Sequence, residues 1–68
     1  MNEVIFIVEQ APEGGYVARA LGHSIYTEAD TWNDLKTATH DAVVCHWSDE
    51  ERPPIIRLHF LREEVVAA

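Results

Sequence analysis

The stretch Glu3-Val4-Ile5-Phe6-Ile7-Val8-Glu9 decides how the rest of the chain folds. Its five central residues are β-branched or aromatic and a charged residue stands at each end, a composition typical of a β-strand. Successive side chains of a strand point to opposite faces, so Ile5 and Ile7 share one face and the other three apolar residues share the opposite one. A strand that is apolar on both faces belongs inside a sheet and needs cover on both sides.

The residues that follow this strand predict an antiparallel meander. Pro12 presets φ, and Gly14-Gly15 permits positive φ, so residues 11–15 form a turn. The short loop predicts a hairpin between the first strand and a second strand at 16–20. After another turn, a third strand is expected at 25–29.

Beyond the third strand the apolar period changes from two residues to about 3.6, which predicts a helix. Asp30 or Thr31 can serve as its N-cap, and Thr31 with Asp34 makes a loose capping box. The helix is expected from about 32 to about 47. Pro53-Pro54 prevents any continuation.

The last strand is predicted at 55–61, with Ile56, Leu58 and Phe60 on one face. The element order is then β-β-β-α-β. After three antiparallel strands the helix returns the chain to its start, so the fourth strand can lie parallel to the first. We therefore expect an α+β fold: a four-stranded mixed sheet of order 3-2-1-4 with one helix on one face.

Length and charge limit what such a chain can do. Its 68 residues fit one domain, 1–68, whose small core leaves it marginal without a disulfide, a metal or a partner. Its single cysteine excludes an intrachain disulfide. With 12 acidic residues against 5 Lys and Arg, the net charge of −7 argues against direct binding to nucleic acid or to an anionic membrane surface.

No stretch approaches the roughly 20 apolar residues of a membrane span, and no signal peptide is apparent. The lone thiol is typical of a reducing compartment, so we expect a cytoplasmic protein.

Several segments together resemble the HicB-like antitoxin family. They are the first strand, the hairpin Glu13-Gly14-Gly15-Tyr16-Val17-Ala18, the turn at Gly22, and Glu28-Ala29-Asp30-Thr31-Trp32-Asn33-Asp34-Leu35 entering the helix. The family usually has a glycine where this chain has Ala29. The resemblance spans almost the whole chain and implies a truncated ribonuclease-H-like fold.

The resemblance also implies a partner. HicB-like domains neutralise a small basic ribonuclease, here a HicA-like toxin, and complete members carry an appended DNA-binding segment. No such segment follows the last strand in the printed sequence. The resemblance therefore implies either a stand-alone member or one whose regulatory function is lost.

We expect no catalytic residues, no metal site and no cofactor. Glu3 and Glu9 only flank the first strand, where charges commonly stand. Cys45 and His46 are neighbours on the predicted helix and point about 100° apart, so they do not converge on a metal. Cys45 is interpreted as an inert buried thiol.

Because one helix covers one face, the other face of the sheet is expected to stay apolar and bare, as is the edge of the last strand. This predicts a homodimer or a higher homo-oligomer that uses the uncovered face, that edge, or both. The candidate interface residues are Ile5, Ile7, Ile55, Arg57, His59 and Leu61.

The candidate residues for binding a basic protein are Trp47, Asp49, Glu50 and Glu51. Trp47 is equally compatible with a core contact and with an interface anchor. Three functions remain open: an antitoxin-like module without catalysis, a self-assembling structural or regulatory protein without a toxin, and a small enzyme or ligand binder that uses histidine and Cys45.

Overall fold

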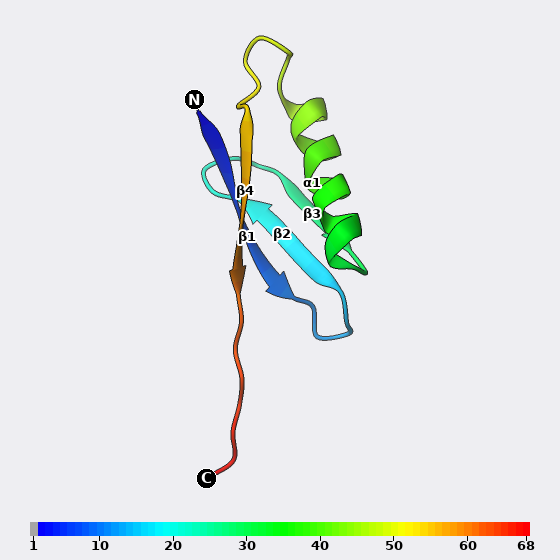
Figure 1. The fold of residues 1–68 in the computed structure, drawn as a ribbon, viewed down its shortest axis with the longest axis vertical. Helices are drawn as coiled ribbons and strands as arrows, with labels where there is room; N and C mark the ends of the chain where they lie inside the picture. Colours follow the sequence, from blue (N-terminus) through cyan, green and yellow to red (C-terminus); the bar gives the residue numbers. More distant parts are fainter. Residues whose placement is uncertain (1) are drawn as a thin grey trace.

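The computed structural model describes residues 2–68 and contains one sheet and one helix (Figure 1). Its elements are β1 (Glu3–Gln10), β2 (Tyr16–Ala20), β3 (Tyr26–Ala29), α1 (Trp32–His46) and β4 (Ile55–Leu61). The strands lie in the order β3-β2-β1-β4, and α1 packs on one face. The predicted α+β fold and its strand order are confirmed.

β1 occupies the interior of the sheet, as its apolar faces predict. It pairs antiparallel with β2, where Phe6 lies opposite Ala20, and parallel with β4, where Phe6 lies opposite Leu58. The β2–β3 pair is again antiparallel. The parallel pair at β1–β4 is possible because α1 carries the chain back along the sheet.

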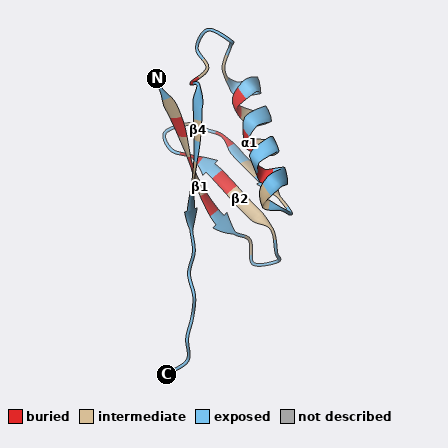
Figure 2. Ribbon diagram, in the orientation of Figure 1, coloured by how far each residue is buried: buried red, intermediate tan, exposed pale blue. Residues whose placement is uncertain are grey.

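The core lies between α1 and the sheet face that carries Val4, Phe6 and Val8, all of which are almost fully buried. Figure 2 shows buried residues on β1, β2 and α1, and exposed ones along β4. Ala18 and Ala20 are the buried residues that β2 contributes to this core. The buried apolar residues are Val4, Phe6, Val8, Ala18, Ala20, Ile25, Leu35 and Val43.

Thr31 begins the helix, since its hydroxyl oxygen accepts a hydrogen bond from the Asp34 amide at 3.1 Å. The buried stripe of α1 consists of Leu35, Thr39 and Val43. The Thr39 hydroxyl donates to the Lys36 carbonyl at 3.0 Å, which satisfies this buried polar group.

The expectation of a buried Cys45 is wrong, because this thiol is exposed. Cys45 follows Val43 by two positions, and the rotation of about 200° places it on the far side of the helix. Three boundaries also differ by one residue, the first being β1, which extends to Gln10 instead of ending at Glu9. The helix ends at His46, and β3 begins at Tyr26 because the Ile25 carbonyl closes the preceding turn by accepting from the Ala20 amide at 3.0 Å.

Gly15 fixes the β1–β2 turn against the end of β3. Its φ is +80°, and a Cβ at this position would lie 2.7 Å from the Ala29 carbonyl oxygen. Gly14 also has a positive φ, of +101°, but faces open space. Only Gly15 therefore combines a conformation that favours glycine with a close backbone contact.

We expect Gly15→Ala to destabilise the fold more than Gly14→Ala. Both variants carry the cost of a positive φ, about 1–2 kcal/mol, and only Gly15→Ala must also push the backbone of β3 away. The difference, at least about 1 kcal/mol, is measured by urea unfolding followed by tryptophan fluorescence. Equal losses would show that the contact with Ala29 relaxes without cost.

Candidate functional site

The structure places the six residues predicted for self-association on the sheet face opposite α1. On β1 and β4, Ile5 lies opposite Arg57 and Ile7 opposite His59. Ile55 and Leu61 take the same face because they stand two and four residues from these positions along β4. The grouping inferred from alternation is therefore present, and whether it forms an interface stays a prediction.

This uncovered face is less bare than the sequence predicts. Ile5 and Ile7 are half-buried although no helix lies over them. Arg57 of β4 donates two hydrogen bonds to the Glu3 carboxylate, at 2.9 and 3.1 Å, and this pair raises the pKa of the guanidinium. Arg19 of β2 lies 3.5 Å from the Glu9 carboxylate. Ion pairs between neighbouring strands thus flank the aliphatic groups.

The outer edge of β4 is the more exposed apolar feature. Among the described residues, β4 pairs with β1 and with no other strand, so its other edge offers free backbone N–H and C=O groups. Ile55 is 50% exposed and Leu61 46%. The chain beyond β4 runs away from the sheet without secondary structure (Figure 1), and Val65 is almost fully exposed.

The residues predicted to bind a basic protein lie at the end of α1 and in the loop that follows. Trp47 is half-buried and packs on the core, with its ring centroid 4.9 Å from that of His23 and 4.6 Å from that of His46. Glu50 and Glu51 are exposed. Trp47 therefore serves mainly as a core contact, and the two carboxylates remain available.

Arg52 holds this loop against the helix. Its Nη2 atom lies 2.9 Å from the Asp49 carboxylate and within 3.5 Å of the carbonyl oxygens of Val44 and Trp47. A cation that donates to the last carbonyls of a helix also interacts favourably with the helix dipole. Arg52 thereby orders the loop that carries the acidic side chains.

We expect Arg52→Gln to destabilise the protein by about 1 kcal/mol, because the contacts with the helix end and with Asp49 are lost. Chemical unfolding measures the effect. Arg62→Gln is the matched control, since Arg62 pairs with Glu64 in the exposed tail and should cost almost nothing. A loss of equal size in both variants would contradict the role given to Arg52.

A second acidic region, not predicted from the sequence, surrounds a hollow of about 540 Å³. We call it the acidic hollow. No lysine or arginine lines it, and its lining residues are Ala11, Glu13, Gly14, Tyr16, Glu28, Ala29, Asp30 and Asp34.

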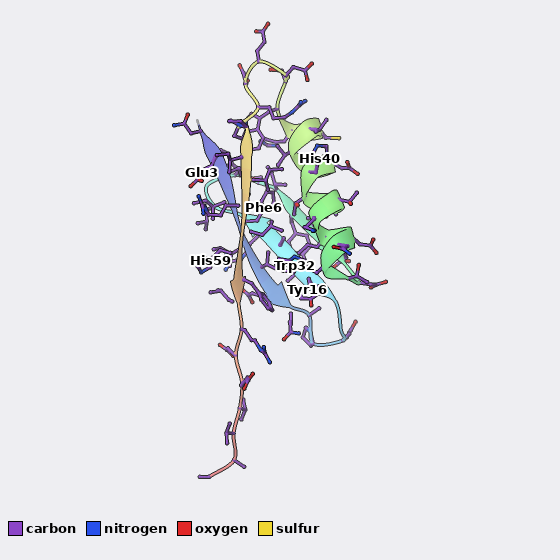
Figure 3. The ribbon with its side chains drawn as sticks, viewed as in Figure 1. Glu3, Phe6, Tyr16, Trp32, His40 and His59 are labelled. Carbon is purple, nitrogen blue, oxygen red and sulfur yellow. The ribbon has the colours of Figure 1, made fainter. Side chains whose placement is uncertain are left out.

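Three segments meet at the acidic hollow: the β1–β2 turn, the end of β3 and the first turn of α1. The β2–β3 register places Tyr16 opposite Ala29, and Gly15 brings the turn against the Ala29 carbonyl. Figure 3 shows Tyr16 and Trp32 side by side near the start of α1, with ring centroids 5.5 Å apart. The hairpin register was the signal that could have revealed this convergence.

None of the four carboxylates of the hollow, those of Glu13, Glu28, Asp30 and Asp34, forms an ion pair within residues 2–68. Asp34 lies in the first helical turn, where the helix dipole favours a negative charge. The other three have no compensating cation in the part of the chain that the structure describes. The hollow is therefore a concave surface of one charge sign.

Two relatives of the chain are informative. It is 52% identical over 55 residues to a UPF0150 protein of Archaeoglobus fulgidus, in a match that covers 81% of this chain and 82% of the relative. It is 35% identical over 66 residues to a UPF0150 protein of Thermotoga maritima, and this match covers 97% of this chain and 93% of that relative. This chain belongs to the UPF0150 family.

No protein-family model and no solved structure matches the chain. The names of the two UPF0150 relatives state no ligand, partner or reaction. The resemblance to HicB-like antitoxins therefore stays a prediction.

The described part of this UPF0150 protein brings no three His, Cys, Asp or Glu side chains together in a geometry that could hold a metal ion. Within residues 2–68, no helix has the length and apolar character needed to traverse a bilayer. The features that remain for function are the acidic hollow, the acidic loop after α1, and the exposed edge of β4.

Proposed function

We propose that this UPF0150 protein is a non-catalytic binding module that takes up a small basic protein, as HicB-like antitoxins do, and that it also self-associates. The acidic hollow carries the first part of the proposal. It is concave, it joins three segments of the fold, and its carboxylates form no ion pair within the described residues 2–68.

The distribution of charge supports a basic partner. Each of the four arginines lies in an ion pair with a carboxylate of this chain. Eight of the 12 carboxylates therefore have no arginine partner within residues 2–68, and together with Lys36 they account for the net charge of −7. Such a surface attracts a basic protein over a distance and orients it before contact.

The location of the hollow supports the resemblance to HicB-like domains. Two of the segments that carry that resemblance are the hairpin 13–18 and the helix entry 28–35. All the lining residues of the hollow except Ala11 come from these two segments. Two of the four segments that carry the resemblance thus meet at this one surface.

The test asks first whether a neighbouring reading frame encodes a short basic protein; such a protein is then co-expressed with the chain and titrated by calorimetry. We expect Glu28→Gln/Asp30→Asn to weaken the complex about tenfold, because two charges facing a basic partner are removed. Added salt should weaken the wild-type complex as well, because it screens the attraction.

Glu50→Gln/Glu51→Gln is the matched control, since it removes the same charge from the loop after α1. It should leave affinity nearly unchanged. If the loop variant alone weakens binding, the partner site is the one predicted from the sequence, around Trp47, and the hollow is not used. If no neighbouring frame encodes a short basic protein, or if the encoded protein does not bind, the antitoxin-like function is wrong.

The exposed β4 edge favours a second candidate function, that of a self-assembling structural or regulatory protein without a toxin. This alternative needs only the self-association of the chain. Cys45→Ser should leave either function intact, because neither uses the thiol, and it separates both from an enzyme that does.

A further inference from the structure

The apolar pattern of β4 reads the same from either end. From Ile55 to Leu61 it runs apolar, apolar, polar, apolar, polar, apolar, apolar, and Leu58 stands at its centre. When a strand pairs antiparallel with a copy of itself, a residue before the midpoint of one copy lies opposite the residue at the same distance after the midpoint of the other. A pattern symmetric about its midpoint is therefore what a two-fold β4–β4 pair needs.

The sheet edge restricts how two copies can align. Backbone N–H and C=O groups point outward from every second residue of β4, because the intervening residues bond to β1. In an antiparallel pair, outward-pointing residues must face one another. The two-fold axis must then pass through a residue and not between two residues.

A two-fold axis at Leu58 matches the side chains best. Leu58 then faces its own copy, Ile56 of one chain faces Phe60 of the other, and Ile55 faces Leu61. The remaining pair is Arg57 with His59, and Arg57 already has Glu3 of its own chain as a partner. All seven residues of β4 take part.

The neighbouring alignments are worse. An axis at Arg57 sets two guanidinium groups opposite each other, and one at His59 sets Arg57 opposite Leu61. An axis at Phe60 sets Arg62 opposite Leu58 and Glu64 opposite Ile56. The self-complementary apolar pairing thus selects the alignment at Leu58.

The surrounding structure leaves room for this pairing. α1 packs mainly against β2 and β3. Its first residue, Trp32, also contacts Phe60 of β4, with ring centroids 5.6 Å apart, on the face that the helix covers and not at the outer backbone edge. Pro54 has no N–H and ends the ladder just before Ile55. The residues lining the acidic hollow come from the other elements and none from β4, so both hollows stay open in a dimer.

We propose that two copies of this chain pair antiparallel through their β4 edges, with Leu58 on the two-fold axis, to form one continuous eight-stranded sheet with both helices on the same side. The strand number follows from the four strands of each copy. This inference rests on the self-association proposed above and names its surface and register.

The test introduces opposite charges at Ile55 and Leu61. Both residues are exposed in the single chain, and they face each other only in this register. Light scattering after size exclusion should give twice the 7.7 kDa of one chain for the wild type. Ile55→Lys and Leu61→Glu should each weaken the dimer by roughly tenfold or more, because each substitution occurs twice across the two-fold axis. The double variant, Ile55→Lys/Leu61→Glu, should recover most of the affinity through two Lys–Glu pairs.

Tyr26→Lys on β3 is the matched control, since Tyr26 is 64% exposed at the opposite edge of the sheet and should not alter the mass. Circular dichroism of each variant checks that the fold is intact. A wild-type monomer at tens of micromolar would overturn both self-association and this interface. A wild-type dimer that the single variants leave intact would overturn the β4 interface. A dimer that the single variants weaken and the double variant does not restore would overturn the register.

Discussion

The structure depends on the burial of β1 between β2 and β4. Phe6 and Val8 have no exposed surface, and each contributes about 1.5–3 kcal/mol by leaving water. Because β1 is apolar on both faces, the sheet must extend on either side of it. The parallel β1–β4 pair in turn requires a crossover, which α1 provides while covering the core. Strand order, helix position and the exposure of β4 at an edge all follow from this one strand.

Positive and negative charges have different places in this fold. Arginines pair across neighbouring strands or hold a loop, as Arg57 does with Glu3 and Arg52 with Asp49. These pairs fix local geometry and use up nearly all the positive charge of the chain. Most of the remaining carboxylates lie at the acidic hollow and in the loop after α1. The surface therefore has an apolar edge along β4 and negative charge at these two places.

The sequence was sufficient to predict the fold because its strongest signals are local. A doubly apolar strand, two glycine-containing turns and a change of period each depend on a few neighbouring residues, and together they permit only a few topologies. Cys45 was misplaced because an apolar residue near the end of a helix fits the pattern loosely, whereas the true stripe continues through the polar Thr39.

The acidic hollow could not be predicted in the same way. Glu13 and Glu28 are distant in sequence, and only the β2–β3 register brings their segments together. The role of Trp47 could not be predicted for a different reason. Composition alone does not distinguish a tryptophan that packs against histidines from one whose ring points into solvent. Both features depend on tertiary geometry, which a single sequence encodes only indirectly.

The parallel direction of β1 and β4 has a practical consequence for attaching labels. Both strands point toward the end of the sheet where the β1–β2 turn lies, and the chain after Leu61 leaves the molecule at that end (Figure 1). A fluorophore or affinity tag fused after Ala68 would extend from the same end. One attached ahead of Glu3 would sit at the opposite pole, near the loop after α1. The two fusion points therefore report on different ends of one molecule.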